Sequence, residues 1–152
     1  MYKRLRPIQG IHVPVHLGNI DLDRPFFYHG IAEIVHMMFM SFGGPLISRH
    51  MNAENRLYVA RQVERSIQAI HELGVLHRDL MPPNILWSTE AGQAMVIDFE
   101  RAEVLKPRIV LGVLSPNRKR KRATKGGLNK QPEERRDEFA REMQRAIVEL
   151  RG

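Results

Sequence analysis

Two short runs of polar residues near the middle of the chain have the types and spacing for joint chemistry. The first, His77-Arg-Asp-Leu-Met-Pro-Pro-Asn84, carries a carboxylate at Asp79 and a carboxamide at Asn84 in one proline-containing loop. The second, Val96-Ile-Asp-Phe99, adds a carboxylate at Asp98. Such hard oxygen ligands suit Mg²⁺, which usually takes one or two protein groups and completes its coordination with water and substrate phosphates. The two runs therefore indicate a site for magnesium and a phosphate compound.

The elements around these runs must bring them together. Residues 84–88 and 94–98 are short apolar segments joined by a connection in which Gly92 supplies the turn, so they predict a β-hairpin. Asn84 opens the first strand and Asp98 closes the second, and antiparallel pairing places such positions within roughly 5 Å. Residues 56–73 predict the helix that leads into the loop, because apolar residues recur there at three- and four-residue spacing.

The flanking segments predict a mixture of strands and helices. Residues 12–17 predict a short edge strand or extension, and residues 31–40, after a turn-prone segment at 21–25, predict one or two buried strands or a short buried helix. Ser41-Phe-Gly-Gly-Pro45 predicts a loop, and residues 133–150 predict an amphipathic helix. The apolar face expected of that helix consists of Phe139, Met143, Ile147 and Leu150. The predicted fold class is α+β.

Length, charge and cysteine content limit the class of protein. The 152 residues allow one ordinary domain with a tail, and the absence of Cys excludes a disulfide framework and thiolate metal sites. No apolar stretch is long enough to span a bilayer, and no apolar segment follows the basic N-terminus, so we expect a soluble intracellular, cytoplasmic protein without a membrane partner. Residues 1–105 hold 10 basic and 11 acidic side chains, whereas residues 106–152 hold 14 basic and 6 acidic ones.

The two polar runs resemble the catalytic loop and the metal-binding Asp-Phe-Gly segment of the protein kinase superfamily. The sequence around them is more similar to short fungal kinase-like proteins than to typical signalling kinases. The resemblance implies that Asp79 orients or deprotonates a hydroxyl acceptor, with Asn84 beside it as a catalytic and metal-binding residue. It implies that Asn84 and Asp98 hold the Mg²⁺ of bound ATP. It also implies a hinge at Ser41, Phe42 and Gly43 that contacts adenine through its backbone.

The resemblance covers about residues 1–105 and departs from the family pattern at several points. No Gly-rich loop, phosphate-anchoring Lys or Glu partner of that Lys is found, so we expect mainly a hinge and C-lobe without most of the N-lobe. Met81 stands where Ser/Thr-type kinases have Lys, Glu100 replaces the Gly of Asp-Phe-Gly, and no Ala-Pro-Glu motif follows. Because phosphoryl transfer depends on positioning and electrostatics, we expect weak or incomplete ATP/Mg²⁺-dependent transfer to a protein or small-molecule hydroxyl. The alternatives are an inactive pseudokinase-type interaction module and a fragment of a longer kinase.

The C-terminal part of the chain, residues 106–152, is distinguished by its positive charge. We divide the chain into a truncated kinase-like domain at 1–105, a basic linker at 106–131 and a terminal helix at 132–152. Five consecutive basic residues, from Arg118 to Arg122, have the composition of a nuclear-import signal and predict weak binding to polyanions or to an import receptor. Import would add a nuclear location to the cytoplasmic one. The alternative is a solubilising spacer that lets the terminal helix dock its apolar face on the domain.

Overall fold

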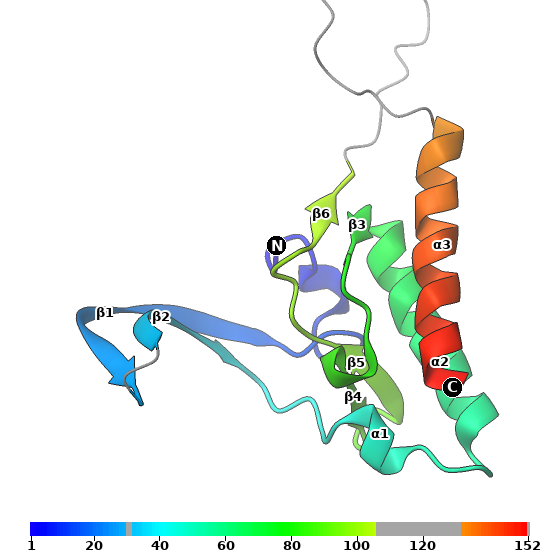
Figure 1. Ribbon diagram of the computed structural model, residues 1–152, viewed down its shortest axis with the longest axis horizontal. Coiled ribbons are helices and arrows are strands. Elements are labelled where there is room, and N and C mark those ends of the chain that lie inside the picture. Colours follow the sequence, from blue (N-terminus) through cyan, green and yellow to red (C-terminus); the bar gives the residue numbers. More distant parts are fainter. Residues whose placement is uncertain (30–31, 106–131, 152) are drawn as a thin grey trace, which may run out of the picture.

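The computed structural model describes residues 1–29, 32–105 and 132–151, which form three two-stranded antiparallel sheets and several helices (Figure 1). The α+β class is therefore confirmed. In chain order the elements are η1 (Arg6–Ile8), β1 (His16–Tyr28), β2 (Ala32–Met40), α1 (Ile47–His50), α2 (Arg56–Glu72), β3 (Val75–Leu76), η2 (Pro82–Asn84), β4 (Ile85–Ser88), β5 (Gln93–Val96), β6 (Glu103–Val104) and α3 (Pro132–Arg151).

Strands β1 and β2 form a long hairpin that extends away from the rest of the molecule (Figure 1). The predicted burial of residues 31–40 is wrong, because most side chains of β2 are exposed, Met37 and Met38 at 41% and 44% among them. The turn predicted at residues 21–25 is also wrong. That segment continues β1 through a register shift between Asp21 and Phe26, since a two-stranded ladder can absorb unpaired residues as a bulge.

The core lies between α2, the β4–β5 hairpin and α3. Helix α2 follows the predicted helix closely, and its buried side chains include Val63, Ile67 and Ile70. Gly74, just beyond its end, has φ +71°, the left-handed conformation expected of a residue that terminates a helix. Ser66 Oγ of α2 donates to the carbonyl of Ala94 at 2.6 Å and so fastens the helix to β5.

Helix α3 packs along α2 (Figure 1), and its apolar side chains enter the same core. The predicted helix at residues 133–150 and its apolar face are confirmed, because Ile147 and Leu150 are buried and Met143 packs against the core. Phe139 contacts the ring of His71 at a centroid distance of 4.6 Å. The domain division at 106–131 stays a prediction, because that segment lies outside the described residues. Among the helices that the structure describes, none is long and apolar enough to cross a membrane.

The loop after β2 crosses close to the β4–β5 hairpin. Ser41-Phe-Gly-Gly-Pro45 forms a loop as predicted, and the amide of Trp87 donates to the carbonyl of Pro45 at 2.8 Å. Gly44 has φ +100°, and a Cβ at this position would lie 1.9 Å from the carbonyl oxygen of Trp87. Glycine is therefore required here both by conformation and by space. The close approach places the loop against the strand that follows Asn84.

Candidate functional site

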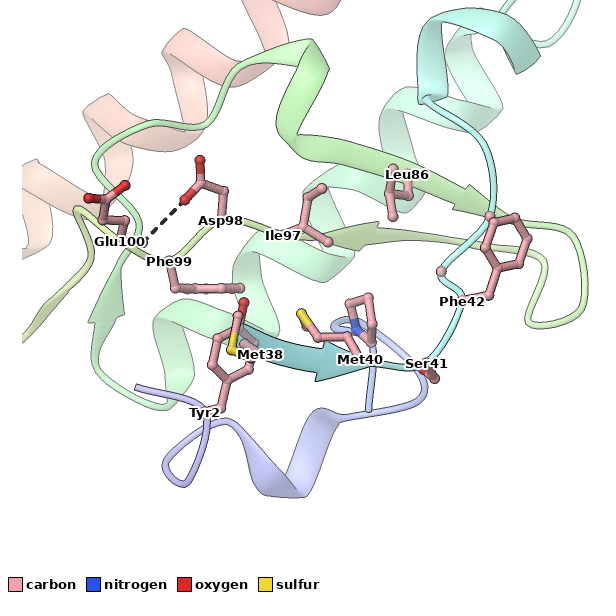
Figure 2. A pocket seen from close by; sticks show the side chains of 13 residues that line it. Tyr2, Met38, Met40, Ser41, Phe42, Leu86, Ile97, Asp98, Phe99 and Glu100 are labelled. Carbon is pink, nitrogen blue, oxygen red and sulfur yellow. Dashed lines mark hydrogen bonds between the residues drawn. The ribbon is translucent and has the colours of Figure 1, made fainter. Parts of the chain in front are cut away.

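A cavity of about 740 Å³ lies between the loop after β2 and the residues that follow β5; we call it the Asp98 cavity. Figure 2 shows Phe42 near one end of this cavity and Asp98 and Glu100 near the other. Most of its wall is apolar, and among the described residues its charged side chains are Asp98 and Glu100. The lining residues are Tyr2, Pro14, Met38, Met40, Ser41, Phe42, Gly43, Gly44, Leu86, Ile97, Asp98, Phe99 and Glu100.

The backbone of residues 41–44 forms one side of this cavity. The Ser41 amide donates to the carbonyl of Val15 at 2.8 Å, and the Ser41 hydroxyl accepts from the Val15 amide at 2.9 Å. These bonds fix the start of the loop against β1. Among the described residues, the backbone groups of Phe42 and Gly43 form no hydrogen bond. They are therefore available to the polar edge of a flat ligand, and Leu86 offers an apolar surface in the same cavity.

Asp98 reaches the cavity from a strained backbone. Strand β5 ends at Val96, so Asp98 lies two residues beyond the strand that it was expected to close. Its φ is +64°, a left-handed conformation that non-glycine residues rarely adopt and that is often found at functional sites. Its carboxylate is exposed and accepts one long hydrogen bond, 3.4 Å from the Glu100 amide (Figure 2). Most of its lone pairs therefore remain free for a ligand.

The loop of residues 77–84 is held by its own hydrogen bonds. His77 is fully buried, donates from Nε2 to the carbonyl of Ile97 at 2.8 Å, and accepts from the Asp79 amide at Nδ1, 3.3 Å away. Burial lowers the pKa of His77, so the ring is neutral near pH 7 and supports the loop by packing and hydrogen bonding. Asn84 donates from Nδ2 to the Asp79 carbonyl at 2.9 Å, which leaves its side-chain oxygen without a hydrogen bond in the described part of the chain.

Asp79 borders a different cavity from Asp98. This second cavity, which we call the Asp79 cavity, has a volume of about 690 Å³ and lies between the 77–84 loop and α3. The Asp79 side chain is 34% exposed, and Oδ2 lies 4.0 Å from Nη1 of the exposed Arg101. Asn84 connects the two sites, because its side chain bonds Asp79 while its carbonyl accepts from the Ile97 amide at 3.0 Å.

The predicted site residues are thus divided between two cavities. The structure brings the predicted hinge residues Ser41, Phe42 and Gly43 into one cavity with Asp98. It places Asp79 in the adjoining cavity, where the other lining side chains come from the 77–84 loop and α3.

The residues present suit a divalent cation that arrives with phosphate groups. Within the described residues no group of three or more His, Cys, Asp or Glu side chains could hold a metal ion alone. Asp98 lines the cavity, and Asn84, whose carbonyl accepts from the amide of Ile97 next to Asp98, carries a second hard oxygen in its side chain. Two protein ligands suffice for Mg²⁺ when phosphate oxygens and water complete the octahedron. The donor set therefore fits the magnesium complex of a nucleotide.

Sequence reasoning missed two residues that border these cavities. Tyr2 lines the Asp98 cavity and packs edge-on against Phe99, with its hydroxyl buried and without a partner among the described residues. Burial and the nearby charge of Asp98 raise the pKa of Tyr2. Glu142 of α3 contacts the 77–84 loop. The sequence contains one sign of this role. Glu142 lies three residues after Phe139 and four before Ala146, so it is a carboxylate on the apolar face of the helix.

Comparison with known proteins identifies the family of the chain. Residues 36–115, just over half of the chain, match the protein kinase domain family. The chain is 40% identical over 123 residues to the meiotic driver SPOK2 of Podospora anserina, a match that spans 79% of this chain and 15% of SPOK2. It is 25% identical over 105 residues to mitogen-activated protein kinase p38a of Drosophila melanogaster, 64% of this chain and 28% of that kinase. It is also 38% identical over 72 residues to calcium-dependent protein kinase 24 of Arabidopsis thaliana, 43% of this chain and 12% of the relative.

Proposed function

The chain belongs to the protein kinase domain family, and we propose that it binds ATP with Mg²⁺ in the Asp98 cavity and transfers the terminal phosphoryl group to a hydroxyl acceptor. The observation that carries this proposal is the common cavity of residues 41–43 and Asp98. We further propose that the described residues correspond mainly to the hinge and C-lobe of a kinase fold. The chain spans a small part of its curated relatives, so the activity of a whole protein is part of the proposal.

Nucleotide binding is supported by the size and chemistry of the Asp98 cavity. A volume of about 740 Å³ lies within the usual range for a small-molecule site. The backbone of Phe42 and Gly43 offers hydrogen-bonding groups to the adenine edge, and Leu86 offers an apolar surface to its face. The triphosphate would then extend toward Asp98, at the other end of the cavity in Figure 2.

The charges of this cavity make the proposed binding dependent on magnesium. Asp98 and Glu100 are both carboxylates, so they would repel a bare triphosphate. When bound, Mg²⁺ would supply positive charge that offsets the repulsion between these carboxylates and the phosphates. Asp98 would ligate through its exposed carboxylate, and Asn84 would ligate through its side-chain oxygen while its amide nitrogen remains bonded to Asp79.

The acceptor would enter from the Asp79 cavity. Asp79 is partly exposed there and would orient the acceptor hydroxyl and accept its proton. Asn84 donates to the Asp79 carbonyl and would thereby hold Asp79 in place when the nucleotide binds. We expect slow transfer, because the acidic wall of the Asp98 cavity leaves much of the developing phosphate charge to the metal ion.

A second candidate is a nucleotide-binding interaction module without transfer activity. It is favoured by the separation of Asp79 and Asp98 into different cavities, since transfer needs the acceptor and the phosphate in contact. Both candidates predict nucleotide binding. They differ in whether Asp79 matters to turnover.

Isothermal titration with ATP, with and without Mg²⁺, tests the common part of the two candidates. We expect binding that requires the metal and is weakened at least tenfold by Asp98→Ala, with Asp137→Ala on α3 as a control of equal charge change. Metal-independent binding, or binding unaffected by Asp98→Ala, contradicts the site assignment. An Asp79→Asn variant then separates the candidates, because proton acceptors of this kind contribute about 10²- to 10⁴-fold to rate. Turnover that is lost in Asp79→Asn supports the kinase, and absence of turnover in the native chain supports the module.

A further inference from the structure

One side of α3 forms a wall of the Asp79 cavity. The helix side chains that line this cavity follow one another at three- or four-residue spacing, so they lie on one stripe of the helix surface. They are Glu138, Arg141, Glu142, Arg145 and Glu149. The rest of the lining comes from residues 78–81, which include Asp79. The cavity therefore extends along α3 and presents a row of charged side chains to whatever approaches Asp79.

Two of these charges are not used by the protein itself. The Arg78 guanidinium donates to Glu138 at 2.8 Å, and Glu142 accepts from the Arg78 amide at 2.6 Å. Arg141 and Arg145 differ, because both are exposed and neither forms an ion pair or a hydrogen bond within the described part of the chain. Two guanidinium groups, one helical turn apart on the cavity wall, therefore remain available to a ligand.

The core holds these two groups in a fixed place relative to Asp79. Ile147 and Leu150 anchor α3 in the core, and Glu142 binds the Arg78 amide directly before Asp79. A site built on a rigid element keeps its charges in place before the ligand arrives. An acceptor that fills the Asp79 cavity therefore meets both guanidinium groups without a rearrangement of the helix.

The length of this wall suits a short stretch of extended polypeptide. From Glu138 to Glu149 the helix rises about 16 Å, at about 1.5 Å per residue. An extended chain covers that distance in about five residues, at about 3.3 Å each. A smaller cavity of about 290 Å³ adjoins the first and shares Arg141, Arg145 and Glu149 with it. The wall is therefore longer than a small hydroxyl compound needs.

We propose that the acceptor is a peptide segment with acidic side chains near its hydroxyl-bearing residue, and that Arg141 and Arg145 bind those carboxylates. The proposal rests on the proposed function, because it takes Asp79 as the group that receives the proton. In that step the acceptor oxygen bonds the terminal phosphorus of ATP, the bond from this phosphorus to the ADP oxygen breaks, and the hydroxyl proton passes to Asp79. Guanidinium groups bind carboxylates through two parallel hydrogen bonds, so they favour acidic side chains over neutral ones.

Fluorescence anisotropy tests the binding of the peptide without any need for turnover. One probe is a labelled peptide with a central serine and glutamates on both sides, and the matched probe has glutamines in their place. We expect the acidic peptide to bind at least tenfold more tightly than the glutamine peptide in about 0.1 M salt. Arg141→Gln combined with Arg145→Gln should weaken binding of the acidic peptide at least tenfold and leave the glutamine peptide within twofold of its native affinity.

Two further variants control for charge and for place. Arg61→Gln combined with Arg136→Gln removes the same charge from exposed positions that do not line the Asp79 cavity, and it should change either affinity by less than twofold. Glu149→Gln removes a like charge from the cavity and should strengthen binding of the acidic peptide about twofold. All these side chains are exposed, so the urea midpoints of the variants should match the native value.

Equal binding of the two peptides overturns the proposal, as does acidic-peptide binding that is unchanged when Arg141 and Arg145 are replaced. Glycerol 3-phosphate, a small anionic alcohol, is the competing probe. If it binds through the two arginines and the acidic peptide does not, the acceptor is a small molecule and the proposal fails. If the native protein transfers phosphate, KM for the acidic peptide should rise about tenfold in the arginine variant, with KM for ATP within twofold. If it transfers none, the proposed function fails, and the anisotropy comparison still decides whether the cavity binds acidic peptides.

Discussion

Individual residues of the site are placed by backbone conformations that their types do not favour. Arg78 and Asp98 both have left-handed φ values, +70° and +64°, and each lies in one of the two polar runs. Such conformations persist when surrounding contacts impose them. For Arg78 those contacts are hydrogen bonds to Glu142, Glu103 and Glu138. Asp98 is held through its two neighbours, because the Ile97 amide donates to the Asn84 carbonyl and Phe99 is buried.

Gly44 offers the sharpest test at this scale. Gly44→Ala should destabilise the protein by about 3 kcal/mol, because the new Cβ would lie 1.9 Å from the Trp87 carbonyl and φ is +100°. Gly92→Ala is the matched control, since φ is +60° there and no atom lies within 4 Å of the new Cβ. The control should lose only about 1 kcal/mol. Urea unfolding measures both, and equal losses would contradict the close contact.

Secondary-structure elements position the site through one shared core. Helix α2 leads into the 77–84 loop, the β4–β5 hairpin leads out of it, and α3 covers α2 and binds the loop. Buried side chains from all three elements belong to one cluster. The loop is therefore anchored at its start, at its end and from the side, which is the arrangement expected of a precise site on rigid elements.

Removing an apolar contact of α3 should reveal this dependence. Leu150 is 2% exposed, so Leu150→Ala should lower the free energy of unfolding by about 2–4 kcal/mol. Val148 lies on the same helix and is 61% exposed, so Val148→Ala should change it by less than about 0.5 kcal/mol. Thermal or urea unfolding of the full chain distinguishes them. A Leu150→Ala protein as stable as the native one would mean that α3 is not part of the core.

Acidification should weaken the contacts of His77 and Glu142 between α2, α3 and the 77–84 loop over two separate pH ranges. Burial lowers the pKa of His77, so acidification below about pH 6.5, the usual histidine value, favours the unfolded chain, which binds the proton more readily. The pKa of Glu142 is also lowered, by hydrogen bonds that exceed the effect of burial. Its contribution is complete above about pH 4.3 and is lost as pH falls through the lower value of the folded state.

Urea midpoints between pH 8 and pH 3 measure this dependence. We expect the midpoint to fall over both ranges in the native protein. Glu142→Gln should reduce the second decline and keep the first, because the His77 contribution does not need that carboxylate. A midpoint that is constant between pH 7 and pH 3, or that rises on acidification, would refute the assignment of these two groups.

The whole molecule is electrically divided. Its positive excess lies in residues 106–152, with 14 basic and 6 acidic side chains, while residues 1–105, which line the whole of the Asp98 cavity, are nearly neutral. The run from Arg118 to Arg122 lies outside the described residues, and its role stays a prediction. Binding of a polyanion there would depend on charge rather than on sequence.

Replacing all five residues from Arg118 to Arg122 by Gln should weaken binding to a single-stranded polyanion and reduce its salt dependence. The slope of log affinity against log salt should fall by up to about 3.5, at roughly 0.7 per contact. A variant with five Lys keeps the charge and should retain the native slope. If the Gln variant keeps the native slope, the run does not bind the polyanion and acts as a spacer. The same two variants, each in a large fluorescent fusion, would test nuclear import.

The sequence by itself determined the parts of this protein that depend on local pattern. The helix at residues 56–72, the β4–β5 hairpin, the 41–45 loop and the amphipathic face of α3 were predicted, because periodicity and turn residues act over a few positions. The expected pairing of Asn84 with Asp98 across the hairpin was only approximate, because Asn84 pairs with Ile97 and Asp98 lies one residue further along. The preference for magnesium and phosphate followed from the residue types, and only the assignment of individual catalytic roles needed the resemblance to a known family.

Tertiary structure decided burial and partners. Residues 31–40 are mostly apolar, and nothing in their own sequence tells whether another layer covers them. Among the described strands, β2 (32–40) pairs with β1 alone, and most of its side chains are exposed. The separation of Asp79 and Asp98 into two cavities depends on the packing of α3 and of the 41–44 loop. Glu142 meets the amides of His77 and Arg78 only because α3 packs along α2, and a contact across 64 residues cannot be read from any local period.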